Sequence, residues 1–227
     1  LVLYRMLVGA IGRSASVWAV VFFASAPLAA MFQVAYPETL FLLLILLGIR
    51  CLQRRRYGWL YAVVLGMAFL RPGVLAFALL LGLFGVWRWT TRRREALRAG
   101  EVVHIATAAA LATICGLSWP VIVATVTGRA DAYLQTELSW RRLWMGDEGG
   151  FVPFEGWFQA ADYWFETWSV NPAWGPVAVL AMTVAVACIL IFVPQVRRLG
   201  MELRLWVASY ALYLLAVTVA FTITGTA

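Results

Sequence analysis

The sequence predicts an all-α, polytopic membrane protein, with about seven transmembrane or re-entrant helices and one long outer loop. Three observations predict this class: a very apolar composition, arginine clusters between apolar runs, and a tryptophan-rich segment with helical periodicity. Of the 227 residues, 63% are hydrophobic and only 13% are charged, and the mean hydropathy is +0.84. A soluble domain of this length would not have enough polar side chains to cover its surface.

Seven apolar segments account for the predicted helices. They are expected at residues 16–32, 38–50, 59–70, 73–89, 102–126, 175–193 and 205–223. The second and third segments are short, because as helices each would span about 20 Å, against about 30 Å for the hydrocarbon core of a bilayer. We therefore expect their outer ends to lie inside the membrane or at its boundary, and we expect the third and fourth segments to form a second hairpin.

The arginines indicate how these segments are oriented. All 18 basic residues are arginine, and 14 of them, with 3 of the 11 acidic residues, fall in four regions, residues 1–13, 50–57, 88–104 and 194–204. The other 4 arginines and 8 acidic residues fall outside these regions. Because cytoplasmic turns are enriched in basic residues, the four regions are expected to face the cytoplasm. The net charge of +7 is then an orientation signal, and it does not indicate a nucleic-acid partner.

This orientation can be tested by labelling single cysteines in an otherwise cysteine-free protein. We expect Gly149→Cys to react with a membrane-impermeant thiol reagent in intact cells, because residue 149 falls in the predicted outer loop. Arg94→Cys should react only after the membrane is permeabilised, because residue 94 belongs to a basic turn. Labelling of both positions from the same side of the membrane would contradict the topology.

The stretch from residue 36 to residue 73 organises the chain. Glu38 and Arg71 are separated from the basic turn at residues 54–56 by nearly equal numbers of residues, so an antiparallel helix pair brings them to similar depth. Ionisable groups at the edge of the hydrocarbon are costly unless they are paired or used. This favours a lipid-phosphate site. The alternative is a carboxylate that begins a helix, near an arginine that extends to the membrane surface.

The predicted outer loop, residues 127–174, contains six of the twelve tryptophans and seven of the eleven acidic residues. Its apolar residues from 154 to 168 recur at intervals of three and four, with polar residues on the other face. These apolar residues are Phe154, Trp157, Phe158, Ala161, Trp164, Phe165 and Trp168. The pattern predicts an amphipathic helix in the membrane interface, which either anchors the loop or contacts a ligand.

A second cluster in this loop combines aromatic and basic side chains. In residues 140–144, a guanidinium from Arg141 or Arg142 could bind a phosphate, while the indole of Trp140 or Trp144 could stack on a sugar ring. Ordinary packing at the membrane interface accounts for the same residues equally well.

Other chemistry is weakly represented in the sequence. The three cysteines lie in apolar segments, and their odd number does not predict a disulfide framework or a metal site. The single histidine, His104, falls at the cytoplasmic end of a predicted helix, and Asp147 and Glu148 lack further ligands for a cation. We predict no metal, no cofactor and no nucleotide-binding loop.

Two short motifs resemble those of a known family. Residues 36–41, Tyr-Pro-Glu-Thr-Leu-Phe, and residues 70–73, Leu-Arg-Pro-Gly, resemble the Tyr-x-Glu-x-Leu-Phe and Arg-Pro signatures of PIG-V-type mannosyltransferases. These enzymes belong to the multi-span GT-C glycosyltransferases. The segment from residue 132 to residue 157, with Trp140, Val152-Pro153-Phe154 and Trp157, is similar to the bacterial branch of that family.

The resemblance implies transfer of mannose from a polyprenyl-phosphate donor to a lipid or glycan acceptor on the outer face of a bacterial plasma membrane. It implies inversion, from a β-linked donor to an α-mannoside. The donor phosphate and sugar would be bound by Arg71, Glu38 and Tyr36. Candidate substrate contacts in the outer loop are Trp140, Arg141 and Trp157.

The resemblance also implies a catalytic base that this sequence does not contain. In GT-C enzymes the base is an acidic residue in the first outer loop, and no such loop precedes the segment at residues 16–32. We therefore expect residues 1–227 to be part of one larger transmembrane domain, with the base upstream.

A multi-span transporter or lipid flippase without transferase activity is the alternative function. Short helices and charges within the membrane fit that class as well, but transporters commonly bind substrate near the midplane, between two repeats. Here the polar groups gather at the outer edge, and the sequence shows no internal repeat. A purely structural membrane subunit would leave the tryptophan-rich loop unexplained.

Overall fold

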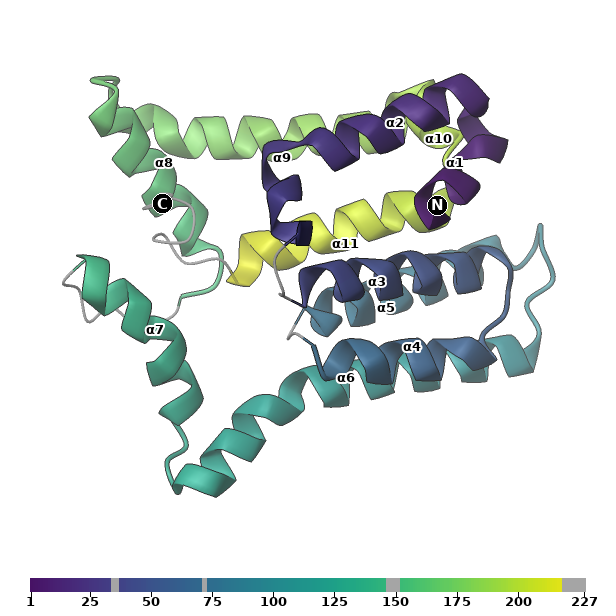
Figure 1. The fold of residues 1–227 in the computed structure, drawn as a ribbon, viewed down its shortest axis with the longest axis horizontal. Helices are drawn as coiled ribbons and strands as arrows, with labels where there is room; N and C mark the ends of the chain where they lie inside the picture. The colour runs from purple at the N-terminus through teal and green to yellow at the C-terminus, as the bar shows by residue number, and fades with distance from the viewer. Residues whose placement is uncertain (34–36, 71–72, 146–151, 218–227) are drawn as a thin grey trace. The chain divides into compact units, whose positions relative to one another are not determined.

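The computed structural model describes residues 1–33, 37–70, 73–145 and 152–217. This part of the chain is helical and contains no β-strand, which confirms the all-α prediction (Figure 1). Its α-helices are α1 (Val2–Ile11), α2 (Arg13–Ser25), α3 (Glu38–Gln53), α4 (Gly58–Ala68), α5 (Val74–Thr91), α6 (Ala99–Thr127), α7 (Ala132–Met145), α8 (Glu155–Thr167), α9 (Gly175–Phe192), α10 (Pro194–Arg197) and α11 (Met201–Val217). Short 3₁₀ helices cover Pro27–Gln33 and Pro172–Trp174.

The chain divides into two compact units. Unit 1 comprises residues 1–117 and 192–209, and unit 2 comprises residues 118–191 and 210–227, of which 218–227 lie outside the described part. The sequence predicted one transmembrane domain over residues 1–227, with an outer loop at 127–174. That wider organisation stays a prediction.

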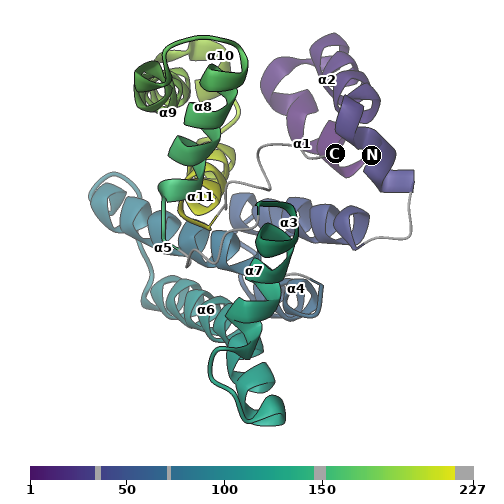
Figure 2. The same ribbon diagram turned by 90° about the vertical axis from the view of Figure 1, so that its left-hand side faces the viewer.

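The core of unit 1 lies among α3, α4, α5 and α6. Figures 1 and 2 show these helices side by side, and Figure 1 shows that successive helices run in opposite directions. Their facing side chains are apolar and almost fully buried, so close van der Waals packing stabilises the core. The central residues are Ile49, Leu52, Leu60, Val64, Met67, Phe77, Leu80 and Phe84.

Among the described residues, three helices are long and apolar enough to cross a bilayer: α5, α6, and α9 together with the 3₁₀ turn before it. The helices α1, α2 and α4 are apolar but shorter. The structure is thus compatible with insertion in a membrane, whereas seven spans stay a prediction.

The predicted hairpins are confirmed. α3 and α4 pack against each other on either side of the basic turn, and α4 and α5 are separate helices that run in opposite directions (Figure 1). The loop after α6 also contains α8, the amphipathic helix that the spacing of residues 154–168 predicts. The helices α1 and α7 were not predicted.

The prediction of one helix over residues 16–32 is wrong. α2 ends at Ser25, and Ala26 adopts an extended conformation with φ −60° and ψ 149°. The cause is Pro27, because the proline ring clashes with a preceding residue in the helical conformation. A 3₁₀ helix then carries the chain to Gln33.

Gly48 leaves room for the side chain of Phe77, from α5, against the surface of α3. A Cβ atom at this position would lie 2.5 Å from Cζ of Phe77 and 3.3 Å from Cγ1 of Val63. Both neighbours are buried, and the Phe77 ring is fully enclosed, so neither can move aside easily.

We therefore predict that Gly48→Ala destabilises the protein by on the order of 1 kcal/mol. Overpacking a core costs about 1 to 3 kcal/mol, which exceeds the gain of up to about 1 kcal/mol from replacing a helical glycine by alanine. Reversible unfolding in mixed micelles would measure the change. Gly9→Ala in α1 is the matched control, since a Cβ there has no neighbour within 4 Å, and it should be neutral or stabilising. Equal effects of the two substitutions would contradict the packing argument.

Candidate functional site

The predicted phosphate site falls only partly within the described residues. Glu38 is half-buried and begins α3, where its carboxylate faces the positive end of the helix dipole. Tyr36 and Arg71 lie outside the described part of the chain.

The chain on the far side of Arg71 does contact the start of α3. A Cβ built on Gly73, directly before α5, would lie 3.0 Å from Cζ of Phe41, in the first turn of α3. Phe41 itself is buried against the core of unit 1. The two sequence motifs thus meet at the Phe41–Gly73 contact.

In unit 2, Trp157 has a structural partner. Its indole Nε1–H donates to the carbonyl oxygen of Leu214 at 3.3 Å, and the backbone N–H of Phe154 donates to Ala216 O at 3.2 Å. Both acceptors belong to the last turn of α11, whose carbonyls have no partner within the helix. The start of α8 therefore caps α11, which favours the packing interpretation of Trp157 over a substrate contact.

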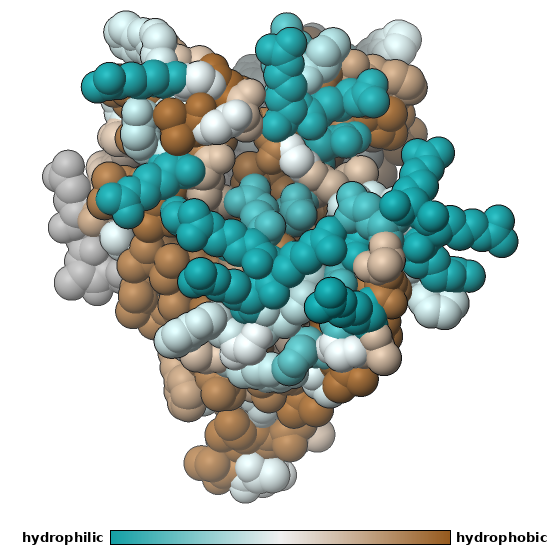
Figure 3. All heavy atoms as spheres, turned by 90° about the vertical axis from the view of Figure 1, so that its right-hand side faces the viewer, coloured by the Kyte–Doolittle hydropathy of each residue, from teal (hydrophilic) through white to brown (hydrophobic). Residues whose placement is uncertain are grey.

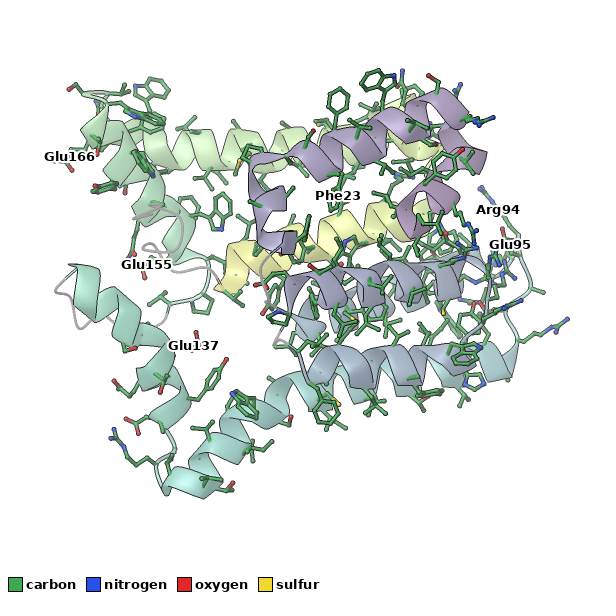
Figure 4. All side chains as sticks on the ribbon, viewed as in Figure 1. Phe23, Arg94, Glu95, Glu137, Glu155 and Glu166 are labelled. Carbon is green, nitrogen blue, oxygen red and sulfur yellow. The ribbon has the colours of Figure 1, made fainter. Side chains whose placement is uncertain are left out.

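The other loop candidates lie on α7. Trp140 and Arg141 belong to this helix, but their side chains are outside the described part. Figure 4 shows that Glu137 projects from α7, while Glu155 and Glu166 project from α8.

Burial and the neighbouring Glu137 charge raise the pKa of Tyr133 to about 12, so Tyr133 stays neutral at physiological pH.

The best-defined polar cluster in unit 1 was not predicted. Arg88, near the end of α5, has only 1% of its side chain exposed, and its Nε–H donates to Oε1 of Glu101 at 2.7 Å. The Tyr57 hydroxyl donates to the same carboxylate oxygen at 2.7 Å. Glu101, in the first turn of α6, is 7% exposed, so this is a buried and hydrogen-bonded ion pair.

Further contacts extend this cluster to the surface. Nη1 of Arg88 donates to Glu95 Oε2 at 3.0 Å, and Nη2 donates to the backbone carbonyl of Ala96 at 3.3 Å. Arg55 also donates to Glu95, which is about half exposed. We call Arg55, Tyr57, Arg88, Glu95 and Glu101 the turn network. It joins the turn between α3 and α4 to the turn between α5 and α6.

The network keeps Tyr57 protonated. Burial and the hydrogen bond to the Glu101 carboxylate raise the pKa of the Tyr57 hydroxyl well above its ordinary value. The hydroxyl is thus a permanent donor at physiological pH.

A second polar contact between α4 and α6 lies one turn further along α6. The Tyr61 hydroxyl is 3.0 Å from Nδ1 of His104 and 2.6 Å from Oγ1 of Thr107. His104 accordingly packs against α4.

The sequence predicted Arg88 and Glu101 only as charged residues of a cytoplasmic turn. A signal was present, because Arg88 stands between Trp87 and Trp89 in an otherwise apolar segment. An arginine in such a segment needs a partner. The identity of that partner depends on how α5 and α6 pack.

Polar side chains gather at this end of unit 1. Figure 3 shows hydrophilic side chains concentrated on the face where the two turns lie, and Figure 4 shows Arg94 and Glu95 in the turn after α5. The arrangement agrees with the predicted clustering of basic turns.

Comparisons with known proteins identify no relative. No protein-family model, no curated protein and no solved structure matches the chain. Any assignment of function therefore depends on the motifs and on the geometry described above.

The buried ion pair predicts that two charge-removing substitutions differ greatly in the stability that they cost. Glu101→Gln should destabilise the protein by on the order of 3 kcal/mol, because it leaves the buried Arg88 charge without its main partner. Glu95→Gln should cost less than about 1 kcal/mol. Glu95 is about half exposed, so solvent screening weakens its ion pairs. Unfolding midpoints in mixed micelles would measure the loss of stability in both variants. Similar losses for the two variants would contradict a structural role of the buried pair.

Proposed function

We propose that this chain is part of a membrane glycosyltransferase of the GT-C type, which transfers mannose from a polyprenyl-phosphate donor to a lipid or glycan acceptor. The observation that carries the proposal is the contact between Phe41 and Gly73. It joins the two segments that resemble the signatures of PIG-V-type mannosyltransferases.

The lengths of α3 and α4 support a site at their outer ends. With 16 and 11 residues, they span about 24 and 17 Å, whereas the hydrocarbon core is about 30 Å thick. If the basic turn lies at the cytoplasmic surface, both helices end below the outer surface. A lipid-linked sugar places its phosphate at this boundary and its tail in the hydrocarbon.

In the proposed reaction, an acceptor hydroxyl attacks C1 of the mannose from the face opposite the phosphate. A bond forms between C1 and the acceptor oxygen, the bond from C1 to the phosphate oxygen breaks, and the hydroxyl proton passes to a carboxylate base. By the resemblance, that base is an acidic residue of the first outer loop of such enzymes. Polyprenyl phosphate leaves, and the anomeric configuration inverts from β to α.

Arg71 would stabilise the departing phosphate. Negative charge on that phosphate grows during transfer, and a guanidinium held in a poorly hydrated site stabilises it better than water does. A guanidinium can also bind two phosphate oxygens at once, which an ammonium cannot. Glu38 would orient Arg71 or bind a sugar hydroxyl, and Tyr36 would lie beside the same sugar.

The remaining elements would complete a bacterial plasma-membrane enzyme with an outward-facing site. We propose about seven transmembrane or re-entrant segments, with α8 lying in the outer interface. The exposed indole of Trp168 and the exposed Glu166 carboxylate on its polar side suit such a position. Trp140 and Arg141 would contact the acceptor or the donor sugar.

The site predicts a graded series of substitutions in the full-length protein. Arg71→Ala should lower the rate of mannose transfer about 100-fold or more, as loss of a key transition-state donor does elsewhere. Arg71→Lys should already impair transfer, because an ammonium cannot reproduce a two-point contact. Glu38→Gln should have a smaller effect than Arg71→Ala. Transfer from labelled polyprenyl-phosphate-mannose would be measured at matched membrane expression.

Arg129→Ala is the control for this series. Arg129 is exposed, pairs with Asp131 at 3.1 Å and lies outside the proposed site. Its loss should leave transfer nearly unchanged. Near-normal transfer by Arg71→Ala would refute the phosphate site and leave Arg71 as an arginine that extends to the membrane surface.

A further inference from the structure

A groove runs between the last turns of α5 and the first turns of α6 on the surface of unit 1. It has a volume of about 240 Å³, and it is lined mainly by apolar residues and glycines, among them Leu81, Gly82, Gly85, Val86 and Ala106. A Cβ atom at Gly82 would have no neighbour within 4 Å, so the groove is open at this residue. Its apolar lining suits a hydrocarbon chain.

A shallow basic hollow adjoins this groove. Trp89, Leu97 and Val102 line both of them, and the hollow adds Arg92 and Arg93. The apolar groove therefore leads into a region with two guanidinium groups at the turn between α5 and α6.

Arg92 and Arg93 differ from the arginines of the turn network in their ion-pair partners. Glu95 and Glu101 form ion pairs with Arg55 and Arg88. Within the described residues, no carboxylate forms an ion pair with Arg92 or Arg93, and both side chains are exposed. The hollow thus retains two positive charges.

Arg92 is also oriented by its surroundings. Its guanidinium carbon lies 3.9 Å from the centroid of the Trp89 ring, and Nη1 donates to the Trp89 carbonyl oxygen at 3.0 Å. A cation stacked on an indole keeps its remaining N–H groups available. An exposed tryptophan is typical of the level of lipid head groups.

We propose that the groove and the hollow together bind one anionic glycerophospholipid from the cytoplasmic leaflet. An acyl chain would lie in the groove between α5 and α6, and the phosphate of the head group would lie between Arg92 and Arg93. Basic pockets between transmembrane helices on the cytoplasmic side suit such lipids. The site is separate from the proposed donor site, which is at the other end of α3. It depends on the membrane orientation but not on transferase activity.

Native mass spectrometry of the delipidated full-length protein would test this site. Phosphatidylglycerol should bind more tightly than phosphatidylcholine with the same acyl chains. The double variant Arg92→Gln/Arg93→Gln should lose roughly 25-fold in phosphatidylglycerol affinity, at about fivefold for each cation removed. Binding of phosphatidylcholine should change little. Both positions are exposed, so the variant should fold.

Three control variants test whether the lipid uses both the groove and the hollow. Arg94→Gln removes one charge from the same turn but not from the hollow, so it should have little effect. Gly82→Leu should weaken the binding of both lipids, because its side chain would occupy the groove. Arg71→Ala should leave lipid binding unchanged, which distinguishes this site from the donor site.

Several outcomes would overturn the proposal. An Arg94→Gln loss as large as that of Arg92→Gln alone would indicate diffuse attraction to a basic turn. Unchanged binding by a folded Gly82→Leu variant would show that no acyl chain uses the groove. Equal competition by soluble glycerol phosphate at the same concentration would indicate a site for free phosphate.

Discussion

The burial of Arg88 is the constraint on which the organisation of unit 1 depends. A guanidinium with 1% of its surface exposed is stable in an apolar helix only if nearby groups satisfy its charge and its N–H donors. Glu101 and Glu95 supply the charge, and the carbonyl of Ala96 accepts a further hydrogen bond. Because these partners follow α5 in the chain, they determine how α5 turns into α6.

The turn network also joins the hairpin of α3 and α4 to the hairpin of α5 and α6. Tyr57 and Arg55, from the turn between α3 and α4, contact Glu101 and Glu95. The basic ends of the hairpins are thereby fixed to each other. The other ends of α3 and α5 meet through Phe41 and Gly73, where the two motifs lie. In the proposed enzyme, the turn network and the apolar core would hold the site near Glu38 in a constant geometry.

Much of the fold could be predicted from local patterns. The arginines at residues 54–56 and the Arg71-Pro72-Gly73 break predicted where α3 ends, where α4 begins and ends, and where α5 begins, and three-and-four spacing predicted α8. Pro27 could have corrected the first predicted segment. The pairing of Arg88 with Glu101 and the capping of α11 by Trp157 could not be predicted, because they depend on which helices pack together. Of the predicted site, only Glu38 and Trp157 have described side chains, and Trp157 has a packing partner.

The most direct test of the proposed activity distinguishes a transferase from a transporter. Full-length protein would be reconstituted in sealed proteoliposomes, and polyprenyl phosphate carrying labelled mannose would be added with an extract of membrane acceptors. Product analysis would follow both the chemical form of the label and its side of the bilayer. A transferase is expected to produce a new α-mannoside and free polyprenyl phosphate. Movement of intact donor across the bilayer, without a new glycosidic bond, would contradict this function and favour a flippase.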